Sequence, residues 1–173
     1  MAGQDLVEVE LVGVRVELPS NTPVVLLREL EGERRSLSIF IGGPEATAIA
    51  FALEGVETPR PLTHDLMCNV LGALSIELVS VVITELVDNT YFAELNLQGP
   101  DGAQLVSSRP SDAVALAARA GCPIYARTSL VDEVGFIEEV DVESDEDPAV
   151  NPDVVVEEFR NFIDNVSPDD FAS

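Results

Sequence analysis

The chain of 173 residues carries 32 acidic side chains against nine basic ones, which gives a net charge of −23 at pH 7. All nine basic residues are arginine, so Schiff-base enzymes and Walker A nucleotide-binding loops, which use a lysine, are excluded. A surface this acidic repels phosphate backbones, and nucleic acid can bind only where a divalent cation or a small arginine cluster offsets that repulsion.

The N-terminal segment predicts a long strand, a hairpin and a helix. Apolar residues alternate up to Leu11 and then change phase at Val12, which indicates a β-bulge in a bent strand. Two further strands are predicted at residues 24–30 and 35–41, on either side of a glycine-containing turn. They lead into a helix over residues 43–54, with a proline in its first turn and a glycine after its end.

A separate helix is predicted over residues 63–74, with Thr63 as its N-terminal cap. Apolar side chains recur along it at helical spacing and therefore predict one apolar face. That face consists of Leu66, Val70, Leu71 and Leu74.

Residues 76–120 repeat the order of the first segment. The alternation changes phase again between Leu78 and Val79, two strands follow at 91–97 and 103–108, and a helix spans 109–120. This order predicts an internal duplication of a βββα unit, and the alternative is a chance match between two common arrangements. Either way, we expect an α+β fold with a mixed, strongly bent β-sheet and flanking helices.

The C-terminal part divides into three regions. A short strand at 123–126, a short helix at 129–134 and a strand-like segment at 136–140 complete a predicted domain of residues 1–140. Residues 141–152 are acidic and contain two prolines, which predicts a flexible linker. Apolar side chains recur at helical spacing in residues 153–173, so we expect a C-terminal amphipathic helix in an acidic tail. This helix either docks on its own domain or reaches a neighbouring subunit.

The two cysteines, Cys68 and Cys122, follow no metal-binding or redox spacing, so we expect packing residues in a reducing cytoplasm. The sequence shows no export signal and no apolar run of membrane-spanning length. We therefore expect a cytoplasmic protein without membrane association.

Polar chemistry is concentrated where two of the predicted helices begin. Residues 60–66 and 107–117 each bring an Arg-Pro pair to the first turn of a helix. In both turns a carboxylate lies among backbone N–H groups that have no partner within the helix. These two helix starts are therefore where we look for function.

Three ordered motifs make the chain resemble a known family. Residues 41–55 contain Ile-Gly-Gly-Pro-Glu-Ala and Leu-Glu-Gly, residues 60–66 read Arg-Pro-Leu-Thr-His-Asp-Leu, and residues 109–117 read Arg-Pro-Ser-Asp-Ala-Val-Ala-Leu-Ala. With Pro-Ile-Tyr at 123–125, they resemble the bifunctional nuclease domain family, long known as a domain of unknown function. The resemblance covers residues 7–137 and implies cleavage of DNA and RNA, an α+β fold and homo-oligomers.

The motifs indicate candidate site residues, and each of these residues could instead have a purely structural role. His64, the only histidine, could act as a general base or ligate a cation, or it could simply cap or pack its helix. Asp65 and Asp112 could hold Mg²⁺ or Mn²⁺ together if the two helix starts meet, with Glu45 as a weaker candidate ligand. Alternatively, both aspartates only stabilise their helix N-termini.

The arginines and a serine of the motifs are candidate phosphate-binding groups. Arg60 and Arg109 could grip phosphate bidentately, or they could pair with nearby acids such as Glu45 or Asp112. Ser111 could bind phosphate or cap its helix. Members of the family often carry an aspartate where this chain has Ser107, and this departure bears on metal binding.

Two functions of different classes fit these features. The first is a divalent-metal-dependent nuclease of low sequence preference, with His64, Asp65, Arg109 and Asp112 as the catalytic residues. The second is a non-catalytic regulatory or assembly module, which oligomerises through its sheet and uses its acidic tail to engage a basic partner.

Overall fold

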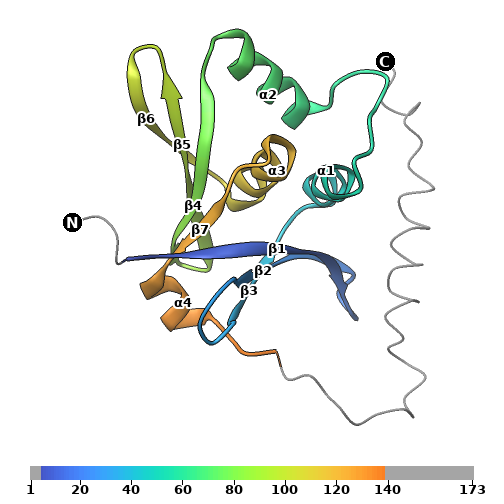
Figure 1. Cartoon of the computed structure of the whole chain (residues 1–173). Helices are drawn as coiled ribbons and strands as arrows, with labels where there is room; N and C mark the ends of the chain where they lie inside the picture. The colour runs from blue at the N-terminus through green and yellow to red at the C-terminus, as the bar shows by residue number, and fades with distance from the viewer. Residues whose placement is uncertain (1–4, 139–173) are drawn as a thin grey trace.

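The structure of the protein, a computed structural model, describes residues 5–138 and has one mixed sheet flanked by helices (Figure 1). The strands are β1 (Leu6–Glu17), β2 (Thr22–Glu29), β3 (Ser36–Phe40), β4 (Glu77–Val87), β5 (Thr90–Gly99), β6 (Gly102–Ser108) and β7 (Ile124–Arg127). The helices are α1 (Gly43–Glu54), α2 (Thr63–Ala73), α3 (Pro110–Ala120) and α4 (Thr128–Val134).

The seven strands have the order β3-β2-β1-β7-β4-β5-β6. Strand β7 joins two antiparallel meanders, because it pairs antiparallel with β1 and parallel with β4. The α+β class and the mixed sheet are therefore confirmed. Each meander is followed by a helix, so the order βββα occurs twice, while the duplication of one ancestral unit stays a prediction.

The predicted changes of phase correspond to bulges. The register of β1 against β2 shifts between Leu11 and Gly13, and that of β4 against β5 shifts between Leu78 and Ser80. A bulge places an extra residue in one strand and increases its bend and twist. The periodicity of the sequence thus located these two bulges correctly, whereas it did not indicate a further register shift of β4 against β5 between Ile83 and Glu85.

Helices α1 and α3 pack side by side against the concave side of the bent sheet, and α4 lies on the other side of β1 (Figure 1). Helix α1 contacts β1 and β2, whereas α3 contacts β4 and β5. The buried face of α3 is rich in alanine, which lets α1 and α2 approach its backbone closely. Because α3 is fixed by both neighbours, the N-termini of α1, α2 and α3 are held in one region.

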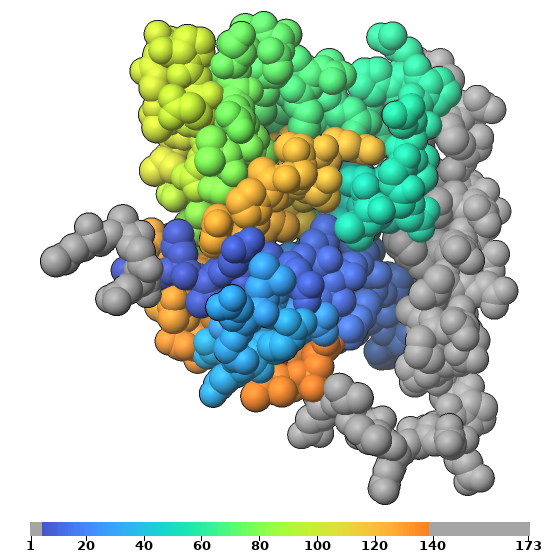
Figure 2. Space-filling model, in the orientation of Figure 1, coloured from blue at the N-terminus to red at the C-terminus, as the bar shows by residue number. Residues whose placement is uncertain are grey.

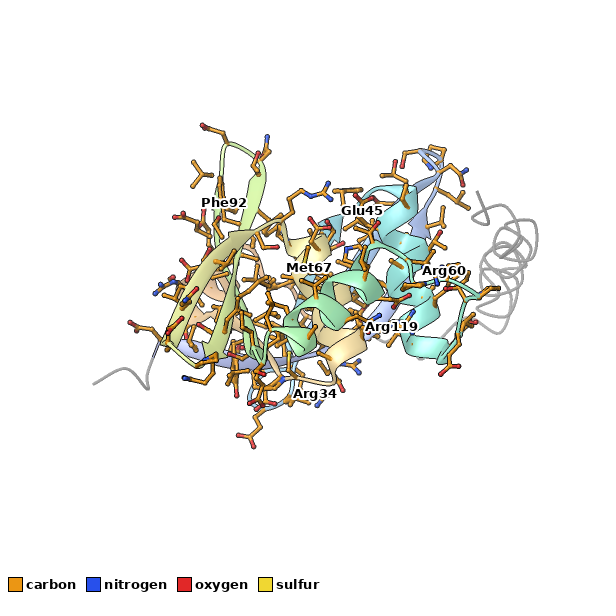
Figure 3. The ribbon with its side chains drawn as sticks, turned by 90° about the horizontal axis from the view of Figure 1, so that it is seen from above. Arg34, Glu45, Arg60, Met67, Phe92 and Arg119 are labelled. Atoms are coloured by element: carbon orange, nitrogen blue, oxygen red, sulfur yellow. The ribbon has the colours of Figure 1, made fainter. Side chains whose placement is uncertain are left out.

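Helix α2 corrects the expectation drawn from its apolar pattern. None of its residues is buried, and Leu66, Val70 and Leu74, three members of the predicted apolar face, are 52, 47 and 60% exposed. Figure 3 looks down on α2, with Met67 on the outward side of the helix. Only the side that carries Cys68 and Leu71 packs against the core. The helix therefore presents an apolar stripe to solvent within the described part of the molecule.

Two smaller expectations were wrong, and one lies beyond reach of the structure. The N-cap of α2 is Leu62 rather than Thr63, because the Asp65 carboxylate accepts the Leu62 N–H and fixes the helix start one residue earlier. Residues 136–138 form only an isolated bridge, Ser36 with Phe136, instead of a strand. The linker and the C-terminal helix predicted at 141–173 lie outside the described residues.

Two further features concern the cysteines and membrane association. Burial raises the pKa of the Cys68 thiol and of the Cys122 thiol, and both cysteines are free.

Among residues 5–138, no helix has the length and apolar character needed to span a bilayer.

Candidate active site at the meeting of three helix starts

The starts of α1, α2 and α3 enclose a pocket of about 510 Å³. Its walls are formed by Gly43, Pro44, Glu45, Thr47, Ala48, Leu62, Thr63, His64, Arg109 and Asp112. Helix N-termini carry partial positive charge, which favours an anion in such a pocket. The two Arg-Pro motifs, distant in sequence, thus contribute to one concave surface.

The start of α2 directs two neighbouring side chains to different places. Asp65 accepts a hydrogen bond from the Leu62 N–H at 3.1 Å and forms an ion pair with Arg119 of α3. Its neighbour His64 faces the pocket, where only 13% of its side chain is exposed. Successive helical residues point about 100° apart. The Asp65 pair therefore fixes the helix, and His64 is presented to the pocket.

The start of α3 anchors the charged part of the pocket. Proline at residue 110 keeps Arg109 extended, with φ −71° and ψ 144°, so that its side chain folds back over the first turn. Arg109 donates from Nε to Asp112 Oδ2 at 2.7 Å and from Nη2 to Asp112 Oδ1 at 2.9 Å. The same Nη2 donates to Glu45 Oε1 of α1 at 2.9 Å. One guanidinium thus joins two carboxylates from two helices.

A hydrogen bond joins the histidine to the same carboxylate. His64 Nε2 lies 3.0 Å from Asp112 Oδ1. Burial by itself raises the pKa of the Asp112 carboxyl, but the hydrogen bonds from Arg109 and His64 outweigh burial and hold the pKa below its usual range. Asp112 is therefore a carboxylate at neutral pH, and it keeps the proton of a neutral His64 on Nε2. The lone pair of His64 is then on Nδ1.

Arg109 retains hydrogen-bonding capacity for a ligand. Its side chain is 66% exposed, and the hydrogen bonds to Asp112 and Glu45 use only Nε and Nη2. Within the described part of the chain, Nη1 has no hydrogen-bond partner, so its two N–H groups face no competing acceptor there. The hydrogen bonds that Arg109 donates to Asp112 raise the pKa of Arg109, which keeps the guanidinium charged.

The remaining predicted residues lie elsewhere. Arg60 is exposed and is not part of the pocket wall, and Asp65 is engaged with Arg119. Ser111 is buried in the first turn of α3 and lines a neighbouring pocket instead. The N-cap position of α3 belongs to Arg109, so Ser111 does not cap the helix. Ser107 lies exposed near the end of β6.

The carboxylates of the pocket match the ligand needs of Mg²⁺ or Mn²⁺ only in part. Residues 5–138 contain no group of three or more His, Cys, Asp or Glu side chains placed to hold one ion. Mg²⁺ is commonly held by one or two carboxylates together with water and substrate phosphate. Asp112 and Glu45 fit this smaller requirement, because both reach the same Arg109 nitrogen and both line the pocket.

Of the two alternatives drawn from the sequence for Arg109, pairing with Glu45 and Asp112 is the one that the structure shows, whereas the contribution of Thr47 to the pocket wall was not foreseen. The signal for Glu45 was present, since it occupies the place in the first βββα segment that Ser111 occupies in the second. For Thr47 there was no signal, because its hydroxyl donates within its own helix to the Gly43 carbonyl.

Comparison with known proteins gives two results. A model of the bifunctional nuclease domain matches residues 25–139. Two proteins from strains CDC 1551 and H37Rv of Mycobacterium tuberculosis, each named as an uncharacterized protein, are 48% identical to this chain over 168 residues. The alignments cover 96% of this chain and 98% of each relative.

Proposed function

Because the chain belongs to the bifunctional nuclease domain family, we propose that it hydrolyses DNA and RNA phosphodiester bonds with low sequence preference, assisted by a divalent cation. One observation carries the proposal: His64 and Arg109, from two separate helix starts, share the Asp112 carboxylate in the wall of one pocket. A general base and a phosphate-binding cation are thereby placed side by side.

In this proposal His64 is the general base. With its proton held on Nε2 by Asp112, the imidazole accepts a proton from the attacking water at Nδ1. Asp112 orients the ring and stabilises the imidazolium that forms, because the carboxylate stays ionised. The burial of His64 limits competing water around the ring.

Arg109 binds the phosphate. Its Nη1 N–H groups can donate hydrogen bonds to a non-bridging phosphate oxygen, and its charge stabilises the additional negative charge of the transition state. Asp112 and Glu45 keep the guanidinium from swinging away into solvent. Because these two carboxylates outnumber the single arginine, the pocket carries net negative charge with neutral His64, and phosphate binding there needs a further cation.

Asp112 and Glu45 would hold Mg²⁺ or Mn²⁺, and the bound ion would polarise a phosphoryl oxygen. Removal of divalent cations with a chelator is then expected to abolish cleavage, and addition of Mg²⁺ or Mn²⁺ to restore it. Cleavage at an unchanged rate in excess chelator would contradict this part of the proposal.

The experiment on the base is a comparison of variants purified in the same way. His64→Gln is expected to lower the cleavage rate of a labelled oligonucleotide by about 10²–10⁴-fold. The unfolding transition serves as the control for folding, since glutamine preserves a hydrogen-bonding group at the helix start. Cleavage that persists at the wild-type rate in His64→Gln would assign the activity to another site or to a contaminant.

A second candidate function, an oligomeric assembly module, is favoured by the outward stripe of α2. The stripe consists of Leu66, Met67, Val70 and Leu74, and no charged residue lies between its ends. Figure 2 shows the α2 segment on the upper surface of the molecule. In a chain of net charge −23, a second copy meets the least like-charge repulsion at such an uncharged face. We therefore propose that two copies pair stripe to stripe, as two-fold symmetry allows.

Sedimentation velocity tests the assembly proposal. The full chain is expected to be dimeric, Val70→Asp monomeric, and Leu105→Asp unchanged, because Leu105 is an exposed apolar residue on β6 instead of on α2. A monomeric full chain would contradict the proposal. So would a dimer that is lost on truncation after residue 140, since the C-terminal segment would then be the partner surface. Engagement of a basic partner by the acidic tail stays a prediction.

A further inference from the structure

A second pocket, of about 370 Å³, lies next to the first and shares Arg109 with it. It is formed where the end of β3, the turn between β4 and β5, and the first turn of α3 come together. Its walls consist of Ile39, Phe40, Ile41, Gly42, Asn89, Thr90, Tyr91, Arg109, Pro110 and Ser111. Because one arginine belongs to both walls, a ligand bound by that arginine can extend into both pockets.

The two pockets differ in charge. The first contains two carboxylates, the histidine and Arg109, whereas among residues 5–138 Arg109 is the only charged side chain in the wall of the second. In a chain with 32 acidic residues, a wall free of acids suits an uncharged group that is covalently attached to an anion. A nucleobase attached to its phosphate is such a group.

Two aromatic residues give the second pocket surfaces on which a base can stack. Phe40 is 61% exposed, which is unusual for a side chain that gains so much from burial. Tyr91 is half-buried, and this burial raises the pKa of its phenol, so the ring stays neutral in the physiological range. Stacking on an aromatic ring is tolerant of sequence, because every base has a π-face.

Polar groups of the second pocket can bond the edge of a base without selecting one. Asn89 offers both a donor and an acceptor, and the hydroxyls of Thr90 and Ser111 can do either. Asn89 lies in a tight turn with φ 60°, in the left-handed region that asparagine tolerates. The turn holds it at the pocket wall.

The geometry points to a nucleobase subsite in the second pocket: we propose that an unstacked base of a single-stranded substrate lies against Phe40 while its phosphate is bound by Arg109. This inference rests on the proposed nuclease function and adds the strand preference. A paired base must be extruded from the duplex before it can enter such a pocket, at a cost of a few kcal/mol. Single strands are therefore the preferred substrate.

Binding, measured apart from cleavage, tests the subsite. Fluorescence anisotropy of a labelled oligothymidine in Mg²⁺ is measured in the His64→Gln background, so that the strand stays intact. Phe40→Ala is expected to weaken binding about 5- to 100-fold, since stacking on one aromatic side chain is worth about 1–3 kcal/mol. Phe40→Tyr should restore binding, and annealing of the complementary strand should weaken binding to the His64→Gln protein that keeps Phe40.

Phe92→Ala is the matched control. Phe92 is also an exposed aromatic residue, but it lies on β5 apart from Glu45 in Figure 3 and belongs to neither pocket wall. The binding constant of Phe92→Ala for the oligothymidine should equal that of the His64→Gln protein without a second substitution. Equal affinity of Phe40→Ala and Phe92→Ala, equal affinity for single and double strands, or no binding at all would overturn the subsite.

The two proposals fail in different ways. Binding that depends on Phe40 in a protein that never cleaves would refute the nuclease and support the subsite. Cleavage that depends on His64 but not on Phe40 would support the nuclease and refute the subsite. Ultraviolet cross-linking of an iodouridine strand gives the location directly, because the modified peptide should contain residues 39–42 or 89–91.

Discussion

Replacement of Asp112 by asparagine is the most informative perturbation of the candidate site. Asparagine keeps the shape of the side chain but removes its charge and turns one acceptor oxygen into a donor NH₂ group. In the structure the two oxygens of Asp112 accept bonds from Arg109 and from His64. The variant therefore disturbs the general base and the phosphate-binding arginine together, without opening a cavity.

The magnitude follows from these three bonds. Hydrogen bonds to charged groups contribute about 1.5–3 kcal/mol each in buried settings. Arg109 is 66% exposed and Asp112 28%, so water replaces much of that contribution, and the net loss of unfolding free energy should be about 1–2 kcal/mol. A typical domain has about 5–15 kcal/mol of stability and stays folded after such a loss. Cleavage, by contrast, should fall by about 10²–10⁴-fold, since the base loses its orientation.

The assay compares urea unfolding with the cleavage rate of a labelled single strand for the same preparation. Asp132→Asn is the control, because Asp132 pairs with Arg35 at 2.8 Å on a different part of the surface. It should lose stability by no more than about 1 kcal/mol and keep its activity. The reasoning is refuted if Asp112→Asn retains more than about a tenth of the wild-type rate, or if both variants lose activity equally.

Four further predictions concern stability, pH and salt. Asp65→Asn should lower the unfolding free energy in urea by about 1–2 kcal/mol and leave cleavage within a few-fold; a loss as deep as that of Asp112→Asn would instead make Asp65 a metal ligand. Glu29→Gln should cost about 3 kcal/mol in the same assay, because Glu29, 5% exposed, is buried against Arg35, and a cost below about 1 kcal/mol would contradict this. Because the folded pKa of Asp112 is depressed, its stabilising contribution is complete above the ordinary carboxyl pKa of about 4 and disappears as the pH falls through the folded value, so the stability difference between wild type and Asp112→Asn should vanish in acid. The KM for an oligonucleotide should fall as salt rises from about 0.01 to 0.15 M. Over this range the Debye screening length falls from about 30 to 8 Å, so the net charge of −23 repels the oligonucleotide less. A rising KM would show that local attraction to Arg109 dominates.

Several structural features followed from local patterns. The phase changes at Leu11 and Leu78 predicted the bulges, since a strand has a side-chain period of two and one extra residue reverses it. Proline in the first turn and glycine after the last predicted the limits of α1 and α3, because both residues restrict the backbone locally. The order of these elements was enough for the α+β class.

Patterns of the same kind misled for α2. Its apolar spacing predicted an amphipathic helix but not which way the apolar face points. Most of the predicted apolar face lies outside the core. Only the packing of α2 against α3, and the Asp65–Arg119 pair that joins them, decides the rotation of the helix about its axis. That rotation also sends His64 to the pocket, so the packing of α2 on its neighbours determines both features.

The sequence alone determined the strands of the two meanders, the bulges at Leu11 and Leu78, the limits of α1 and α3 and the family, because each depends on the period or the backbone preference of neighbouring residues. Only the tertiary structure decided that Asp112 joins His64 to Arg109, that Glu45 shares that arginine, and that Phe40 lies in an adjoining pocket. His64 and Asp112 are 48 residues apart in the sequence, and Glu45 and Arg109 are 64 residues apart. Their distances depend on how the whole sheet bends and how three helices pack on it, which no local pattern contains.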